Sequence, residues 1–148
     1  MPLIKNPKDR SEETRKLLLT QWSVCVSQAD AISSKRLNSN NIYITVNAAL
    51  VALMSFTSDW QNCMIALLGI VVVILWNRSL KSYRRLNAAK YKIILELEKH
   101  LPASPMDAEW ELLKQDKKYH RLTSTEYVLP LVFLMLYILM PVMSYFFA

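Results

Sequence analysis

All eighteen Lys and Arg residues of this 148-residue chain lie outside three hydrophobic segments, and this separation limits the possible folds more than any other feature. The segments are residues 41–56, 60–76 and 128–147. Basic residues that flank membrane helices stay on the cytoplasmic side. Three spans that cross in alternate directions would keep residues 1–40 and 77–127, which hold every Lys and Arg, in the cytoplasm. The C-terminus would then lie outside.

The composition fits this interpretation. Hydrophobic residues make up 53% of the chain, above the roughly 45–50% that is usual for soluble proteins. The net charge of +6 is expected to set the topology and to attract anionic lipid headgroups, at about 1 kcal/mol per basic residue near the surface. No nucleic-acid-binding motif accompanies the charge, so nucleic acid is not an expected partner.

The sequence therefore predicts an all-α membrane protein with three transmembrane helices, N-terminus inside and C-terminus outside. Four regions are expected. They are a cytoplasmic N-terminal amphipathic helix (1–40), a transmembrane helical hairpin (41–76), a cytoplasmic helical region (77–127) and a C-terminal transmembrane helix (128–148). The first forty residues lack the apolar core of a signal peptide, and no domain is expected after the last span.

The N-terminal helix is predicted from one apolar stripe. Asp9 and Glu12 have capping-box spacing at its start. The stripe recurs at spacings of four and three residues, as on an amphipathic helix. It consists of Leu18, Trp22, Cys25, Ala29 and Ile32. The stripe could face the bilayer surface, the cytoplasmic body or a neighbouring subunit. The polar residues 38–41 either end this helix or only interrupt its stripe.

The second hydrophobic segment is expected to continue into the cytoplasm. No Gly or Pro interrupts residues 70–101, and a helical stripe extends past the apolar segment. A single helix from Trp60 to His100 would be roughly 60 Å long at about 1.5 Å per residue. The stripe holds Trp76, Leu80, Tyr83, Asn87, Ile94, Leu97 and Leu101, with Lys90 as its one charged step. The cytoplasmic bundle is thus the N-terminal helix, this extension and a short Trp-containing helix.

Proline and capping residues mark the remaining helix ends. Pro102 stops the second helix, and Ser104 with Pro105 has the pattern of an N-cap and first helical position. Thr123 and Glu126 have capping-box spacing before the last span, and Pro141 inside that span is expected to kink it.

Nothing in the sequence recommends an enzyme. His100 and His120 are twenty residues apart with no cysteine near either, which matches no zinc signature. The single glycine, Gly69, lies in a hydrophobic segment, so a Gly-rich phosphate loop is excluded. We expect no catalytic residue, no metal and no cofactor.

Two sets of residues are candidates for function. Asn47 and Ser55 belong to the first predicted span, where they either contact another helix or line a pore. The second set is expected to make assembly contacts in the cytoplasmic body, whose few helices could hardly cover their own apolar faces in a single copy. It comprises Trp22, Tyr83, Arg84, Asn87, Lys90, Glu96, Leu97, Glu109 and Trp110. Within it, Arg84 and Lys90 could pair with Glu96 or Glu109 or bind lipid headgroups, and Trp110 either packs in the core or anchors a partner.

Part of this region resembles a known family. The run from Ser82 to Tyr91 (SYRRLNAAKY), a Glu-containing helix that ends in Leu101-Pro102, and the pair Glu109-Trp110 are similar to the RipA family of octameric bacterial inner-membrane proteins. A Thr/Glu start to the last membrane helix follows in the same order. The resemblance implies a location in the inner membrane and a ring of eight subunits, and it implies no catalytic residues.

Three hypotheses follow. The first is a non-enzymatic homo-oligomeric scaffold whose cytoplasmic ring docks an unidentified cytoplasmic protein. The alternative is a pore or membrane-depolarising effector, for example in bacterial phage defence. The third is an enzyme that acts on lipid or nucleic acid near the membrane.

Overall fold

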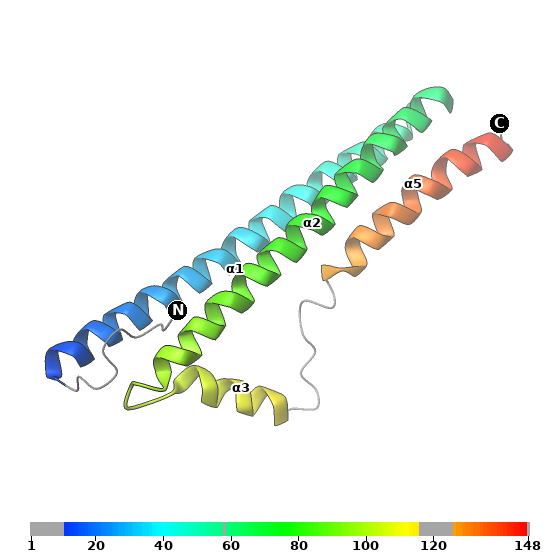
Figure 1. Ribbon diagram of the computed structural model, residues 1–148. Helices are drawn as coiled ribbons and strands as arrows, with labels where there is room; N and C mark the ends of the chain where they lie inside the picture. Colours follow the sequence, from blue (N-terminus) through cyan, green and yellow to red (C-terminus); the bar gives the residue numbers. More distant parts are fainter. Residues whose placement is uncertain (1–10, 58, 116–125, 148) are drawn as a thin grey trace. The chain divides into compact units, whose positions relative to one another are not determined.

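The computed structural model describes residues 11–57, 59–115 and 126–147, and this part of the chain is all-helical. Its helices are α1 (Glu12–Met54), α2 (Asp59–Glu98), α3 (Pro105–Gln115) and α5 (Val128–Phe147) (Figure 1). The all-α prediction is therefore confirmed over these residues. The predicted capping roles of Asp9 and Thr123, and His120, lie outside the described residues.

The chain divides into two compact units. The first unit contains Met1–Ser34 and Tyr83–Tyr119, and the second contains Lys35–Ser82 and His120–Ala148. The predicted region boundaries at residues 40/41 and 76/77 fall inside α1 and α2, which run through them without a break. Residues 38–41 therefore interrupt the apolar stripe of α1 but not the helix.

A tight turn in the second unit joins α1 to α2. Ser55 N–H donates to Ala52 O at 3.1 Å, which tightens the end of α1. The buried Asn62 closes the turn, because its amide donates to Thr57 O at 3.3 Å and accepts from the Thr57 hydroxyl. These bonds satisfy polar groups that a helix end leaves without intrahelical partners. A helical hairpin is therefore present, with each of its helices extending beyond the hydrophobic segment, and its passage through a membrane stays a prediction.

In the first unit, the apolar stripes pack as their spacing predicts. All five stripe residues of α1, from Leu18 to Ile32, are buried or half-buried. On α2, Ile94 and Leu97 are buried beside them. The single long helix predicted from Trp60 to His100 is confirmed as α2, and α3 begins at Pro105 as predicted.

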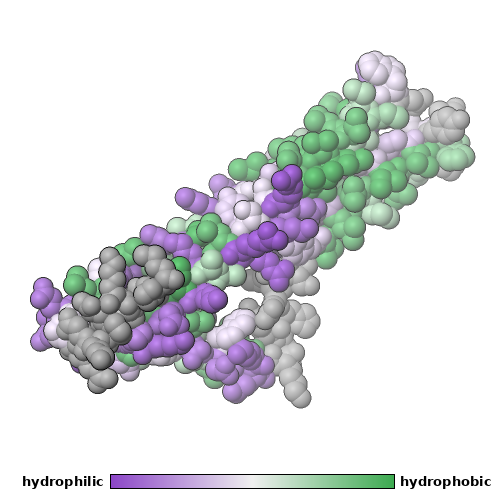
Figure 2. All heavy atoms as spheres, in the orientation of Figure 1, coloured by the Kyte–Doolittle hydropathy of each residue, from purple (hydrophilic) through white to green (hydrophobic). Residues whose placement is uncertain are grey.

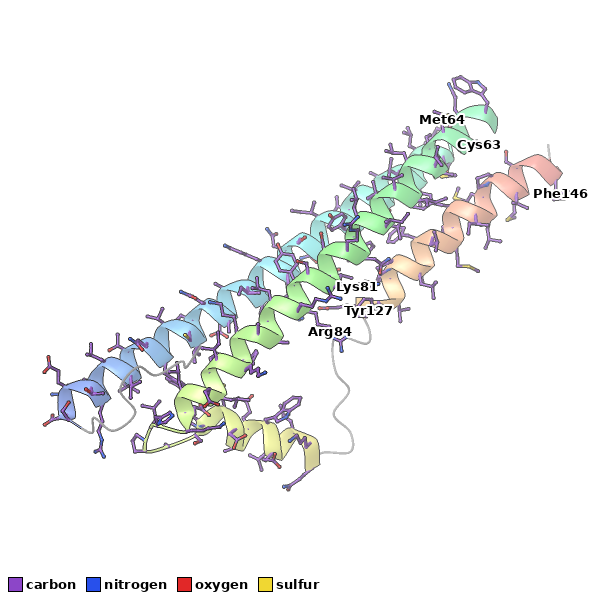
Figure 3. The ribbon with its side chains drawn as sticks, in the orientation of Figure 1. Cys63, Met64, Lys81, Arg84, Tyr127 and Phe146 are labelled. Carbon is purple, nitrogen blue, oxygen red and sulfur yellow. The ribbon has the colours of Figure 1, made fainter. Side chains whose placement is uncertain are left out.

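In the second unit, α5 packs with α1 and α2 around a small apolar core. Met54, Ala66, Val73 and Tyr137 form its buried centre. On the face shown in Figure 2, hydrophobic side chains cover much of this unit, where α2 from Trp60 to Leu75 and α5 expose large apolar residues. Hydrophilic side chains are also exposed in this unit, among them Lys35, Arg78 and Lys81. Cys63 and Met64 project from the first turns of α2, and Phe146 from the end of α5 (Figure 3).

Among the described helices, α2 from Trp60 onward is the one whose length and composition would let it cross a membrane. Val128–Ser144 is apolar but shorter. The candidate span in α2 agrees with the second predicted span, and the other two spans stay a prediction.

Candidate functional site

The chain's one glycine makes room for a tyrosine in the second unit. A Cβ on Gly69 would lie 2.2 Å from Cζ of Tyr137, far inside van der Waals contact. No described residue has a positive φ. Gly69 is therefore needed for the room that its missing side chain leaves, and not for an unusual backbone conformation. The ring of Tyr137 on α5 therefore lies directly on the backbone of α2.

The hydroxyl of Tyr137 reaches across to α1. It donates toward Oδ1 of Asn47 at 2.9 Å and toward the Asn47 carbonyl at 3.2 Å. The Asn47 amide donates to Tyr43 O at 2.7 Å, and its side chain is fully buried (0% exposed). Both the amide nitrogen and the amide oxygen of Asn47 thus have hydrogen-bond partners inside one protomer. We call Asn47, Gly69 and Tyr137 the tyrosine notch; it joins three helices.

A second polar contact lies further along the same unit. The buried indole of Trp76 donates to Oδ1 of Asn40 at 2.9 Å. Its ring stacks on Tyr43, with centroids 5.8 Å apart and planes 7° apart, and meets Phe133 of α5 at 6.1 Å. The Tyr43 hydroxyl pairs with the Ser79 hydroxyl at 3.2 Å. Every polar group here is neutral and bonded across helices.

Charge is buried in the second unit as a pair. Arg36 on α1 lies 3.4 Å from the Glu126 carboxylate just before α5, and their side chains are only 15% and 13% exposed. Nε of Arg36 has no hydrogen-bond partner within the described residues. A buried ion pair compensates part of the desolvation that an isolated charge would suffer.

In the first unit, a single buried carboxylate joins three helices. Glu98, at the end of α2, is 1% exposed. It accepts from the Trp22 indole of α1 at 3.2 Å, from Met106 N at 3.1 Å and from Asp107 N at 3.2 Å. We call this set the Glu98 cap.

The sequence around the Glu98 cap explains its form. The first N–H groups of a helix lack intrahelical acceptors, and Pro105 has no N–H to satisfy. The next two N–H groups of α3 therefore point at Glu98, whose negative charge also suits the positive end of the α3 dipole. Since α3 buries no residue completely, these bonds are a large part of what holds it.

The structure distributes the other predicted residues over several roles. Leu97 is buried in the first unit, and Trp22 is half-buried and belongs to the Glu98 cap. Lys90 donates to Gln28, and Glu96 pairs with Lys99 at 2.7 Å. The predicted ion pairs of Arg84 or Lys90 with Glu96 or Glu109 are therefore not the ones that Lys90 and Glu96 form. The hydrogen bond and charge of Lys99 lower the pKa of Glu96.

The remaining candidates lie nearer the surface. Tyr83 and Asn87 are half-buried, and Oδ1 of Asn87 has no hydrogen-bond partner in the described part of the chain. Arg84, on the side of α2 in Figure 3, is exposed, as are Glu109 and Ser55. Trp110 is 36% exposed, with the Lys114 ammonium 5.8 Å from its ring centroid.

Sequence reasoning missed Glu98, Tyr137 and Asn40, although signals for the first two are present. Glu98 is a carboxylate on the apolar stripe of α2 beside a Leu-Pro break. Tyr137 is the one hydrogen-bonding side chain in residues 128–143. A lone hydroxyl in one apolar helix and a lone amide, Asn47, in another are expected to pair.

The described residues offer no group of three or more His, Cys, Asp or Glu that could hold a metal ion. The polar contacts described above join helices to one another. Together with the exposed hydrophobic side chains of α5 and of α2 from Trp60 to Leu75, and with the candidate span in α2, they are those of an α-helical membrane protein.

Comparison with known families names the group. The model of the octameric membrane protein family (8xMP) matches residues 19–146, and the chain belongs to this family. The predicted resemblance is thereby confirmed, and membership implies self-association in a membrane. Searches of the curated proteins and of the solved structures found no match.

Proposed function

We propose that the protein is a non-enzymatic homo-oligomeric scaffold of the bacterial inner membrane, whose first unit forms a cytoplasmic docking platform. One observation carries the proposal: where α2 from Trp60 to Leu75 and α5 expose large hydrophobic side chains, the buried Asn47, Tyr137 and Trp76 direct their polar groups inward to partners on other helices. Lipid requires this arrangement, because unpartnered polar groups are costly there. The hydrophilic first unit suits water and protein partners.

The proposed topology has three spans, with the N-terminus inside and the C-terminus outside. The distribution of Lys and Arg supports it, because every basic residue then lies on the cytoplasmic side. The basic residues of the first unit would also attract anionic headgroups.

Cysteine labelling tests this topology. In a Cys25→Ala/Cys63→Ala background, Ser55→Cys places an exposed thiol at the hairpin turn, and Ser23→Cys places one in the first unit. A membrane-impermeant maleimide added to intact cells should label Ser55→Cys and spare Ser23→Cys until the cells are opened. The reverse pattern would overturn the orientation.

A conducting pore is the second candidate. Eight copies around an axis surround a central region, and the exposed Ser55 lies at the end of α1 where a mouth could form. Asn47 is a poor lining residue, since Tyr137 and the Tyr43 carbonyl already occupy its side chain.

Planar-bilayer recordings of the purified oligomer separate the two candidates. A scaffold should leave the bilayer insulating, with Ser55→Trp indistinguishable from wild type. Conductance that Ser55→Trp blocks, with the mass of the oligomer unchanged, would replace the scaffold by the pore. An enzyme would instead reveal itself through a single polar substitution that abolishes turnover while the oligomer stays whole.

A further inference from the structure

The proposed topology restricts how copies can meet. Copies that share one orientation in a bilayer can be related only by rotation about an axis normal to it. A closed ring of such copies has head-to-tail contacts, so each copy must present two different and complementary surfaces. The inference below rests on the proposed function for this shared orientation and on the octameric family for the ring.

The first surface lies on α3. Ala108, Glu109 and Leu112 recur three and four residues apart, so they share one face of this helix. All three are exposed, and Leu112 is exposed to 69%. Glu109 is the acid of this face, and Glu111 on the same helix is paired with Lys114 at 2.7 Å. We call Ala108, Glu109 and Leu112 the acidic patch.

The second surface lies on the cytoplasmic part of α2. Its exposed residues also recur at helical spacing and combine apolar side chains with flanking positive charge. They are Arg85, Leu86, Ala89, Lys92 and Ile93, and Leu86 is 48% exposed. The ion pairs described in this unit use Lys16, Lys99 and Lys114, not the basic residues of this set. We call this set the basic patch.

We propose that the acidic patch of each copy docks on the basic patch of the next copy in the ring. The apolar centres, Leu112 on one side and Leu86 with Ile93 on the other, would bury each other. Glu109 would face Arg85 or Lys92 at the rim, where opposite charges select the partner and register. The SYRRLNAAKY run contributes three of the five residues of the basic patch, Arg85, Leu86 and Ala89, which gives that run a role in assembly.

Directed cross-linking tests this contact. In the Cys25→Ala/Cys63→Ala background, Leu86→Cys and Leu112→Cys are made in two differently tagged copies and co-expressed. Oxidation in membranes should give a dimer that carries both tags, and one chain with both substitutions should give a ladder toward eight copies. Arg84→Cys replaces Leu86→Cys as the control, because it lies two residues away on another face of the same helix.

A charge exchange provides a second measurement. Glu109→Lys or Arg85→Glu alone should reduce the fraction of octamer in nanodiscs at least severalfold, and the two together should restore it. Both positions are exposed, so neither change should unfold the protomer.

Several results would overturn the proposal. These are dimers of Leu86→Cys with itself, equal cross-linking of Arg84→Cys, or cross-links confined to single chains. An octamer that persists while Arg85→Glu only abolishes binding to anionic vesicles would assign the basic patch to lipid. Failure of the Ser55→Cys labelling would sink the proposed topology, whereas correct labelling without mixed-tag dimers would sink this inference alone.

Discussion

The two units bury polar groups of different kinds. The second unit joins its helices through neutral groups, with Tyr137 on Asn47 and Trp76 on Asn40, and the largely buried charges of Arg36 and Glu126 are paired with each other. The first unit buries the carboxylate of Glu98, which accepts hydrogen bonds from three N–H donors and makes no ion pair within residues 11–57, 59–115 and 126–147. The difference matches the surroundings proposed for each unit, because an uncompensated charge is far more costly in lipid than beside water.

The largest expected effect tests whether the tyrosine notch organises the second unit. Gly69→Ala gains about 1 kcal/mol of helix propensity. It also displaces the Tyr137 ring, and loss of a buried aromatic contact typically costs about 3–5 kcal/mol. We expect a net loss of roughly 3 kcal/mol of unfolding free energy, measured by denaturant titration in detergent. Leu68→Ala, at the exposed neighbouring position, is the control. An unchanged Gly69→Ala protein would show that Tyr137 can relocate at no cost.

Asn47→Asp tests the difference between the two units, because it places an unpaired negative charge in the second unit on a side chain of nearly the same shape. An Asp near the centre of a membrane helix costs about 2.5–3.5 kcal/mol, whereas an interhelix hydrogen bond there contributes about 0.6–2 kcal/mol. Asn47→Asp should therefore destabilise the protein more than Tyr137→Phe, which removes only the hydroxyl. Equal effects in the same titration would mean that water reaches this site.

Glu98→Ala probes the corresponding contact in the first unit. It leaves the Trp22 indole and two α3 N–H groups without their acceptor, at a cost of about 2–3 kcal/mol. Hydrogen exchange should rise sharply in α3 while α5 stays protected. Glu96→Ala, two residues away and exposed, is the matched control. Faster exchange throughout α5 as well would mean that the two units do not unfold independently.

The smallest expected effect concerns Glu96. Its pKa is lowered from an ordinary value of 4.5, mainly by its hydrogen bond to Lys99. Any stability that this pair contributes is therefore present above pH 4.5 and is lost as the pH falls through the lower pKa of the folded state. Because the group is exposed and its partner is an exposed lysine, Glu96→Gln should leave the unfolding midpoint unchanged at pH 7. A clear shift there would indicate that Glu96 is covered in the assembly.

The sequence predicted the helices well because their periodicity depends on local spacing. The stripe from Leu18 to Ile32, the unbroken α2 and the start of α3 at Pro105 all follow from residues that are near one another in the chain. Glu98 escaped prediction because its donors come from α1 and α3, and only the packed fold brings them together. Gly69 was recognised as the single glycine, but its role depends on Tyr137, which comes from a distant helix.

The tyrosine notch also has a consequence for how the chain is made. Ribosomes add about 5–20 residues per second, so α5 follows the hairpin by several seconds. During that interval Oδ1 of Asn47 lacks the hydroxyl that will bond it, and the space above Gly69 is open. Tyr137 is therefore the last part of the tyrosine notch to be made, and its arrival completes the contact among the three helices.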